Sequence, residues 1–200
     1  MDTSHASSEK LQSGLLQPAA LIDALLIHPG MNVADFGCGG GHFTFMLAKK
    51  VGEKGKVYAL DVQATPLDMV KERARVEGIE NIQTIRANLE TPGSSTLADG
   101  SQDLVLVANI LFQSPKKSEI IKEAKRILKP QGRLVLIEWR KGAGGFGPPD
   151  DLRMDEETIH TLVRQEGMKA GEDLHIGEFH HIMTFTRPNF DPQNLGGLTQ

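Results

Sequence analysis

The sequence predicts an α/β fold, with a single doubly wound sheet that is mostly parallel and has helices on both faces. Three observations lead to this prediction. First, apolar runs typical of buried strands alternate with helix-like periods, and strands joined by helices run parallel with right-handed crossovers. Second, a glycine cluster follows the first apolar run, where doubly wound sheets bind ligands. Third, the last two strand-like runs meet at 176–178 with no helix between them, so the last strand should be antiparallel to its neighbour.

Five helices and seven strands follow in order from the spacing of the apolar residues. Pro18 opens the first helix and His28-Pro29-Gly30 ends it, while Lys129-Pro130 ends the fourth. The predicted helices are 18–27, 42–50, 67–77, 118–128 and 155–166. The predicted strands are 31–36, 56–62, 81–88, 103–109, 132–139, 171–177 and 179–186.

The composition predicts one soluble domain at 16–187, between loose tails at 1–15 and 188–200. The chain has 200 residues, of which 39% are hydrophobic and 24% charged, enough for a full core. One cysteine excludes an internal disulfide framework and a cysteine-cluster zinc site. A net charge of −4 argues against a broad nucleic-acid-binding surface. Neither a signal peptide nor an apolar run long enough for a membrane span is visible, so we expect a cytoplasmic protein.

The strongest motif is VADFGCGGGHFT, where a buried strand ends at Asp35 and glycines precede a helix. Glycines in such a turn let a ligand approach the backbone, because no Cβ is in the way. Asp61 ends the second strand 20 residues after Gly41, where a carboxylate can accept hydrogen bonds from both ribose hydroxyls. The glycines could instead form only a tight turn, and Asp61 could cap a helix. Together they favour a nucleoside-type cofactor.

Two common nucleotide-binding motifs do not fit this loop. His42 occupies the sixth position of the dinucleotide pattern Gly-x-Gly-x-x-Gly, which requires glycine there. No Gly-Lys-Ser/Thr sequence supports nucleoside triphosphate hydrolysis. The spacing found is Asp-x-Gly-x-Gly-x-Gly, from Asp35 to Gly41.

Four segments in order resemble the class I S-adenosylmethionine (SAM)-dependent methyltransferases, over roughly residues 18–187. They are PGMNVADFGCGGGHFT, VYALDV, RANLE and ILKPQGRLVLIEW. The resemblance implies a Rossmann-like, seven-stranded sheet with an antiparallel last strand, SAM as cofactor and S-adenosylhomocysteine (SAH) as product. The branch it most resembles is that of the small ubiquinone/menaquinone-biosynthesis C-methyltransferases, which mostly act on small molecules.

The resemblance also assigns roles by position. The methionine end of SAM would lie against the glycine loop, the ribose at Asp61, the adenine beside Asn88, and the sulfonium near Ala108 and Asn109. Asn88 could equally be a turn residue. His42 and Phe43 would close over the methionine portion. The cofactor contacts implied are Asp35, Gly37, Cys38, Gly39, Gly41, Asp61, Val62, Asn88, Leu89 and Ala108.

Substrate contacts are expected after the fourth and fifth strands, at Asn109, Gln113, Trp139 and Arg140. Trp139 could line a pocket rim or only pack, and the glycine-rich loop at 141–151 could be a lid or an idle surface loop. Gln113, Glu138, Arg140 and the histidines are acid/base or anchoring candidates, but no catalytic residue is assigned. His180 and His181 are adjacent in a strand and therefore point to opposite faces. No metal site is predicted.

A small-molecule SAM-dependent methyltransferase is the leading hypothesis. The single cysteine lies in the glycine loop, which disfavours cytosine C5 and arsenite methylation. The fourth strand ends in Ala108-Asn109-Ile110-Leu111 and lacks the (Asp/Asn)-Pro-Pro-Tyr motif of enzymes that methylate amino groups. An RNA or protein methyltransferase, a non-catalytic SAM-binding protein and, less favoured, an NAD-dependent oxidoreductase are the alternatives. The sequence leaves the acceptor atom and the oligomeric state open.

Overall fold

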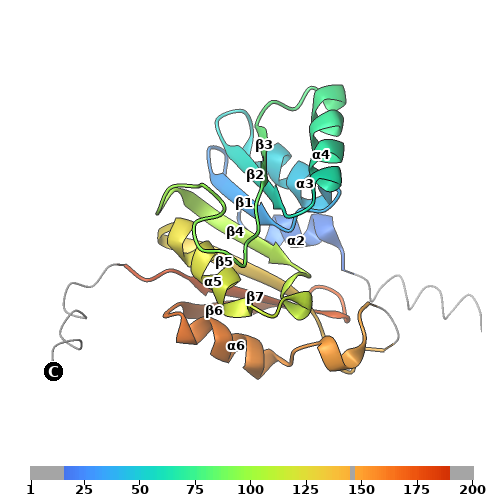
Figure 1. Ribbon diagram of the computed structural model, residues 1–200, viewed down its shortest axis with the longest axis vertical. Coiled ribbons are helices and arrows are strands. Elements are labelled where there is room, and N and C mark those ends of the chain that lie inside the picture. Colours follow the sequence, from blue (N-terminus) through green and yellow to red (C-terminus); the bar gives the residue numbers. More distant parts are fainter. Residues whose placement is uncertain (1–15, 145–146, 190–200) are drawn as a thin grey trace, which may run out of the picture.

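A computed structural model describes residues 16–144 and 147–189 of the chain. Its seven strands form one sheet in the order β3-β2-β1-β4-β5-β7-β6, which confirms the predicted fold class (Figure 1). Strand order reverses between β1 and β4, and in such sheets ligands bind outside the carboxyl ends of the strands at this point. The strands are β1 (Asn32–Phe36), β2 (Lys56–Asp61), β3 (Ile82–Arg86), β4 (Gln102–Ala108), β5 (Leu128–Trp139), β6 (Lys169–Leu174) and β7 (His180–Thr186).

The last strand is antiparallel to both of its neighbours, as predicted. β7 lies between β5 and β6, and its register pairs Trp139 with His180 and Arg133 with Thr186. Because β7 runs opposite to β5, it begins at the edge where β5 ends. The carboxyl edge of the sheet therefore receives the first residue of β7 in addition to the last residues of the parallel strands.

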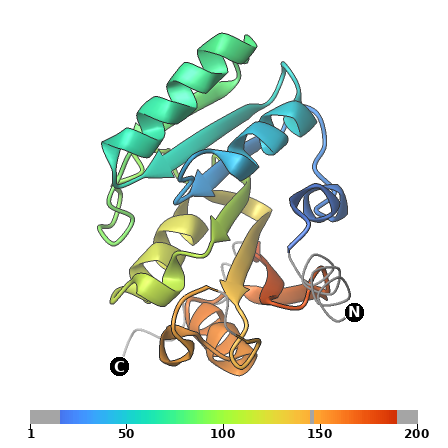
Figure 2. The ribbon, with the colours of Figure 1, turned by 90° about the vertical axis from the view of Figure 1, so that its right-hand side faces the viewer.

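Helices cover both faces of the sheet. Two of the apolar clusters, one with α2 and α3 and one with α4, lie on one face, and the cluster with α5 and α6 lies on the other. Figure 2 shows α2, in dark blue, and α5, in yellow-green, on opposite sides of the strands. The helices are α2 (Pro18–Ala24), α3 (His42–Val51), α4 (Ala64–Glu77), α5 (Lys117–Ile127) and α6 (Glu156–Gln165), with short 3₁₀ turns η1 (Leu111–Gln113) and η2 (Asp150–Leu152).

Most observed boundaries lie within two residues of the predicted ones, and four differ by three or more, including the sixth strand, which ends at Leu174 rather than at 177. The first helix ends at Ala24, because Leu26 has a φ of 48° and cannot continue it. The third helix begins at Ala64, three residues earlier than its apolar spacing indicates. The fifth strand begins at Leu128, and its pairing with β4 then shifts register before Arg133. The tail predicted at 1–15, and that at 188–200 from residue 190 onward, lie outside the described residues.

No helix in the part of the chain that the structure describes combines the length and apolar sequence required to cross a membrane.

Candidate functional site

The glycine loop joins β1 to α3 at the carboxyl edge of the sheet. The amides of Gly37 and Cys38 both donate to the Leu60 carbonyl of β2, at 2.8 and 2.9 Å, which fixes the loop to the neighbouring strand. A Cβ on Gly37 would lie 2.4 Å from Ile110 Cγ2, so glycine is required there by packing. Around Gly39 and Gly40, by contrast, a Cβ would meet no atom within 4 Å. This open stretch of backbone is where a ligand can approach the loop closely.

Asp35 supports the glycine loop from inside the protein. Its side chain is 1% exposed, and its Oδ2 accepts a 2.6 Å hydrogen bond from Thr44 Oγ1 in the first turn of α3. Burial raises the pKa of this carboxyl to about 6, although the bond from Thr44 opposes the rise. The contact ties the end of β1 to the helix that follows the loop.

The carboxylate of Asp61 is held at the end of β2 by two backbone amides. Its Oδ2 accepts from Gly39 N at 3.1 Å, and its Oδ1 accepts from Gln63 N at 2.9 Å. Gln63 is the N-cap of α4, so Asp61 does not cap this helix. Val62 beside it is 54% exposed, which leaves an apolar side chain open next to the acid. The Asp61 carboxylate and the glycine loop are thus joined by a hydrogen bond.

Asn88 and Leu89 lie in the turn after β3. Asn88 Oδ1 accepts from Glu90 N at 3.1 Å, and its carbonyl accepts from Ser94 Oγ at 2.6 Å. These bonds show a turn-forming role for Asn88, while its exposed side chain keeps an amide group at the surface. Leu89 is 7% exposed and packs into the core.

The chain after β4 turns sharply at Asn109, whose φ of 55° lies in the left-handed region that asparagine tolerates better than most residues. Its backbone amide still donates to the Ile137 carbonyl of β5 at 2.7 Å. Glu138 holds the segment that follows, because its Oε1 accepts from Leu111 N at 2.8 Å. Burial raises the pKa of Glu138 to about 7, and its Oε2 is buried without a hydrogen-bond partner among the described residues.

Trp139, His180 and Asn109 come together on the face of the sheet opposite Glu138. The rings of Trp139 and His180 pack with centroids 4.1 Å apart, and His180 Nε2 lies 3.5 Å from Asn109 Nδ2. Burial lowers the pKa of His180 to about 4, so the imidazole is neutral near pH 7. Asn109 Oδ1 and His180 Nδ1 are buried without a partner within the described ranges. Such atoms are costly unless a ligand or water satisfies them.

Arg153 organises the loop beyond β5. Its guanidinium is buried and donates to the carbonyls of Arg140 and Pro148, at 3.0 and 2.9 Å, and to that of Gly144 at 3.3 Å. It also lies 5.7 Å from the ring centre of Trp139. A Cβ on Gly147 would come within 2.5 Å of the same ring. The described part of this loop is therefore packed against the Trp139 ring.

The structure unites some of the predicted substrate residues and separates others. Asn109 and Trp139 both lie against His180, as described above. Gln113 is exposed on η1, with no described contact to that group. Arg140 lies near His181, on the other face of β5, where its charge adds to burial in lowering the pKa of His181.

His42, Phe43 and Cys38 complete the predicted set. His42 is exposed and Phe43 half-buried, with ring centroids 5.7 Å apart at the start of α3. Cys38 is 8% exposed, and burial raises the pKa of its thiol, so it fills space within the loop.

Sequence reasoning does not place two residues that shape this edge. His180 is one of the histidines among the acid/base or anchoring candidates, but apolar alternation does not show that the last strand pairs with the fifth and brings it beside Trp139. Arg153 belongs to no recognisable sequence motif. Its role depends on the path of the loop at 140–149.

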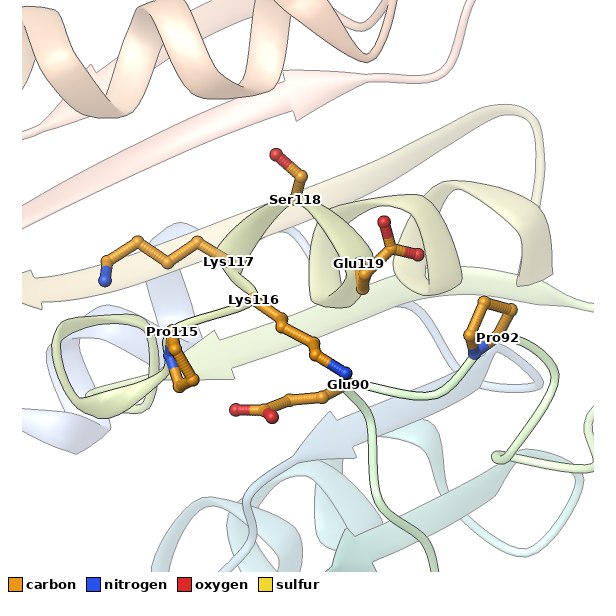
Figure 3. Close-up of a pocket in the computed structure, with 7 residues that line it drawn as sticks. All are labelled: Glu90, Pro92, Pro115, Lys116, Lys117, Ser118 and Glu119. Carbon is orange, nitrogen blue, oxygen red and sulfur yellow. The ribbon is translucent and has the colours of Figure 1, made fainter.

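A hollow of about 530 Å³ lies beside the turn after β3, and Figure 3 shows it between that turn and the start of α5. Lys116 extends across it toward Glu90, whose Oε1 accepts a 2.7 Å bond from Ser114 Oγ. Charges of both signs line the hollow, and it adjoins the Asn88 turn rather than Trp139. Its lining residues are Glu90, Pro92, Pro115, Lys116, Lys117, Ser118 and Glu119.

The residues at the carboxyl edge fit the nucleoside-type cofactor that the sequence predicts. The open backbone at Gly39 and Gly40 suits a polar group that needs close approach, and the carboxylate of Asp61 is aimed by two amides. The exposed Val62 and the amide of Asn88 suit the apolar face and the polar edge of a base.

A family model described as "Methyltransferase domain" matches residues 27–191. A ubiquinone/menaquinone biosynthesis C-methyltransferase from Salmonella paratyphi B is 31% identical over 180 residues, which cover 90% of this chain and 68% of that protein. A demethylmenaquinone methyltransferase from Lactococcus lactis is 35% identical over 109 residues, 54% of this chain. The chain spans 42% of the length of this L. lactis relative and 66% of the length of a Vibrio vulnificus one.

Among solved structures, a SAM-dependent methyltransferase from Aquifex aeolicus superposes with a TM-score of 0.79 at 26% identity. The match covers 93% of this chain and 98% of that one.

Proposed function

The chain belongs to the class I SAM-dependent methyltransferases, and we propose that it transfers a methyl group to a small planar acceptor that carries an oxygen substituent. The observation that supports this acceptor class is the pair of buried atoms without a partner, Asn109 Oδ1 and His180 Nδ1, beside the Trp139 ring. A planar molecule packed on Trp139 can donate a hydroxyl hydrogen to Asn109 and satisfy this oxygen.

The cofactor is SAM, which supplies an electrophilic methyl group on a sulfonium. Gly39 and Gly40 offer the open backbone for its methionine end, Asp61 the carboxylate for the ribose hydroxyls, and Val62 and Asn88 the contacts for the adenine. Because Asp61 is already bound to Gly39, this half of the site is ordered before any ligand arrives. Preorganisation lowers the entropic cost of binding.

The acceptor half of the site orients the nucleophile. In-line displacement requires alignment above all, and orientation can contribute about 7–11 kcal/mol of the barrier in favourable cases. Asn109 is fixed by its backbone bond to Ile137 and by the η1 turn that Glu138 holds. Trp139 is enclosed by His180 and Arg153. A neutral His180, whose Nε2 faces the Asn109 amide, can hold an acceptor oxygen by a hydrogen bond at its free Nδ1.

The names of the relatives agree with this acceptor class. Those from Salmonella and Lactococcus act in quinone biosynthesis by their names, and quinone precursors are planar and carry oxygen. An arsenite methyltransferase from Aquipseudomonas alcaligenes is also 31% identical. Arsenite is bound by thiols, and the one cysteine of these 200 residues is buried in the glycine loop. We therefore favour the oxygen-bearing ring over arsenite.

The cofactor assignment is tested by calorimetric titration with SAM, SAH and NAD. We expect micromolar binding of SAH and SAM, none of NAD, and loss of SAH binding in Asp61→Ala. The matched control is Asp68→Ala, an aspartate whose side chain is 71% exposed on α4, which should bind SAH as the native chain does. Binding of NAD, or full SAH affinity in Asp61→Ala, would overturn the assignment.

The acceptor class is tested separately by incubation with SAM and a panel of phenols, catechols and naphthohydroquinones, with a transfer RNA and a peptide pool beside them. Mass spectrometry should detect a gain of one methylene on a ring compound only. Methylation of the RNA or peptides would support a macromolecular substrate instead. SAH binding without transfer to any member would support a non-catalytic role.

A further inference from the structure

A second cluster of chemically active side chains lies away from the cofactor, between α6 and the hairpin of β6 and β7. Glu156 and His160 are one turn apart on α6, Asp173 lies on β6, and His181 lies on β7. The ligand atoms of Glu156, His160 and Asp173 all lie within 4.8 Å of one another. Figure 1 shows α6 alongside these two strands.

The spacing of these groups is that of ligands around one ion. His160 Nε2 lies 3.0 Å from Asp173 Oδ2, and His181 Nδ1 lies 3.8 Å from Glu156 Oε2. Metal–ligand bonds of about 2 Å in a tetrahedron place neighbouring ligand atoms about 3.3 Å apart. Both observed separations are within about half an ångström of this value.

The burial of the cluster is graded. The side chains of His160 and His181 are 10% and 11% exposed, that of Asp173 is 27% exposed, and that of Glu156 is 58% exposed. Three groups are therefore well enclosed, and the fourth borders solvent, which gives an ion a path of entry.

The hydrogen bonds within the cluster leave part of it unsatisfied. Asp173 Oδ1 and His160 Nδ1 are both buried and have no partner in the described part of the chain. A buried carboxylate oxygen without a donor is costly. A cation bound to Asp173 compensates this oxygen without any rearrangement of the backbone.

We propose that Glu156, His160 and Asp173 bind one divalent transition-metal ion of the zinc type, with His181, which lies beside Glu156 and outside this set of mutually close atoms, as the fourth ligand. Two imidazoles and two carboxylates favour zinc or cobalt over magnesium and calcium, which take oxygen ligands almost exclusively. The ion joins α6 to the two strands and so stabilises the last third of the sheet.

The test uses the untagged full chain after treatment with a chelator. Co²⁺ is added alone, and the visible absorption of a tetrahedral cobalt site is recorded. The affinity for Zn²⁺ is then measured by competition with a chromophoric chelator. We expect one equivalent of cobalt with strong visible bands, and zinc affinity that falls at least about tenfold in Glu156→Gln and in His181→Gln.

Glu157→Gln is the matched control, because Glu157 is the next residue on α6 and its side chain is 78% exposed beside Arg164. It should bind zinc as the native chain does. Circular dichroism checks that each variant is folded, and the exposed position of Glu156 makes its substitution safe for folding. Absence of cobalt bands, or equal zinc affinity in Glu156→Gln and Glu157→Gln, would overturn the proposal. SAH titration is independent of this outcome, so the metal site and the methyltransferase assignment fail separately.

Discussion

The imidazole of His180 packs on the indole of Trp139, with ring centroids 4.1 Å apart, although 40 residues separate them in the chain. The antiparallel pairing of β7 with β5 brings them together. This stack places a neutral imidazole next to Asn109. It connects the last strand to the site formed by the parallel ones.

Replacing His180 with Phe retains a ring on Trp139 and removes both ring nitrogens. We expect kcat/KM for the acceptor to fall roughly tenfold or more, equivalent to about 1.4 kcal/mol. SAH affinity should stay unchanged, because the proposed cofactor contacts lie on other strands. Steady-state kinetics and SAH titration measure the two effects. His175→Phe, at an exposed position before β7, is the control, and an equal loss in both variants would contradict the role of His180.

Replacing Gly37 with Ala should destabilise the glycine loop by about 1–3 kcal/mol. Gly37 has a φ of 72°, and the added Cβ would lie 2.4 Å from Ile110 Cγ2. Urea unfolding measures the change. Gly40→Ala is the matched control, because a Cβ there meets nothing within 4 Å and its φ is outside the left-handed region. Equal unfolding free energies for the two variants would refute the packing argument.

Replacing Glu138 with Gln should alter how stability depends on pH. Burial raises the pKa of Glu138 from 4.5 to about 7, so the folded protein binds this proton more tightly than the unfolded chain does. Its contribution to stability is therefore complete below pH 4.5 and is lost as pH rises through about 7. The total change is on the order of 3 kcal/mol.

The measurement is urea unfolding of the native chain and of Glu138→Gln across that pH range. The difference between the two curves isolates Glu138 from Asp35, whose raised pKa acts in the same direction, and from His180, whose lowered pKa acts in the opposite one. Glu80→Gln, at an exposed position, provides the control. Parallel curves for Glu138→Gln and the native chain would show that the carboxyl titrates normally.

Replacing Arg153 with Lys should loosen the loop after β5. A compact ammonium does not reproduce the fixed fork that donates to three separate carbonyls, so this set of hydrogen bonds is broken up. We expect faster amide hydrogen exchange at residues 141–144 and a higher KM for the acceptor, with SAH affinity unchanged. Arg164→Lys, at an exposed site on α6, should leave the exchange rates as they are. Unchanged exchange in Arg153→Lys would show that other contacts fix the loop.

The parts of the site that the sequence predicts are those encoded locally. The loop from Asp35 to Gly41 and the acid Asp61 follow from glycine chemistry and strand ends, and the structure joins them through the bond from Gly39 N. The fold class follows from alternation of helices and strands. These features depend on residues close in sequence or on a strict interval.

The parts that the sequence does not predict depend on register and loop path. Apolar alternation shows that β7 is a strand, but it does not show that His180 pairs with Trp139. Arg140 was expected at the acceptor site, yet it lies near His181, on the opposite face from Trp139. Glu156 and Asp173 are 17 positions apart in sequence and meet only because α6 packs on β6.

The two adjacent histidines of β7 serve opposite faces of the sheet: His180 faces Trp139, and His181 faces Glu156. Side chains alternate along a strand, so a slip of one residue would turn each histidine to the opposite face. The His180–Trp139 contact and the His181–Glu156 contact therefore both constrain the length of the turn between Leu174 and His180. A single insertion or deletion there that shifted β7 by one position would leave an imidazole at only one of the two sites, because either Phe179 would take the place of His180 or Ile182 that of His181.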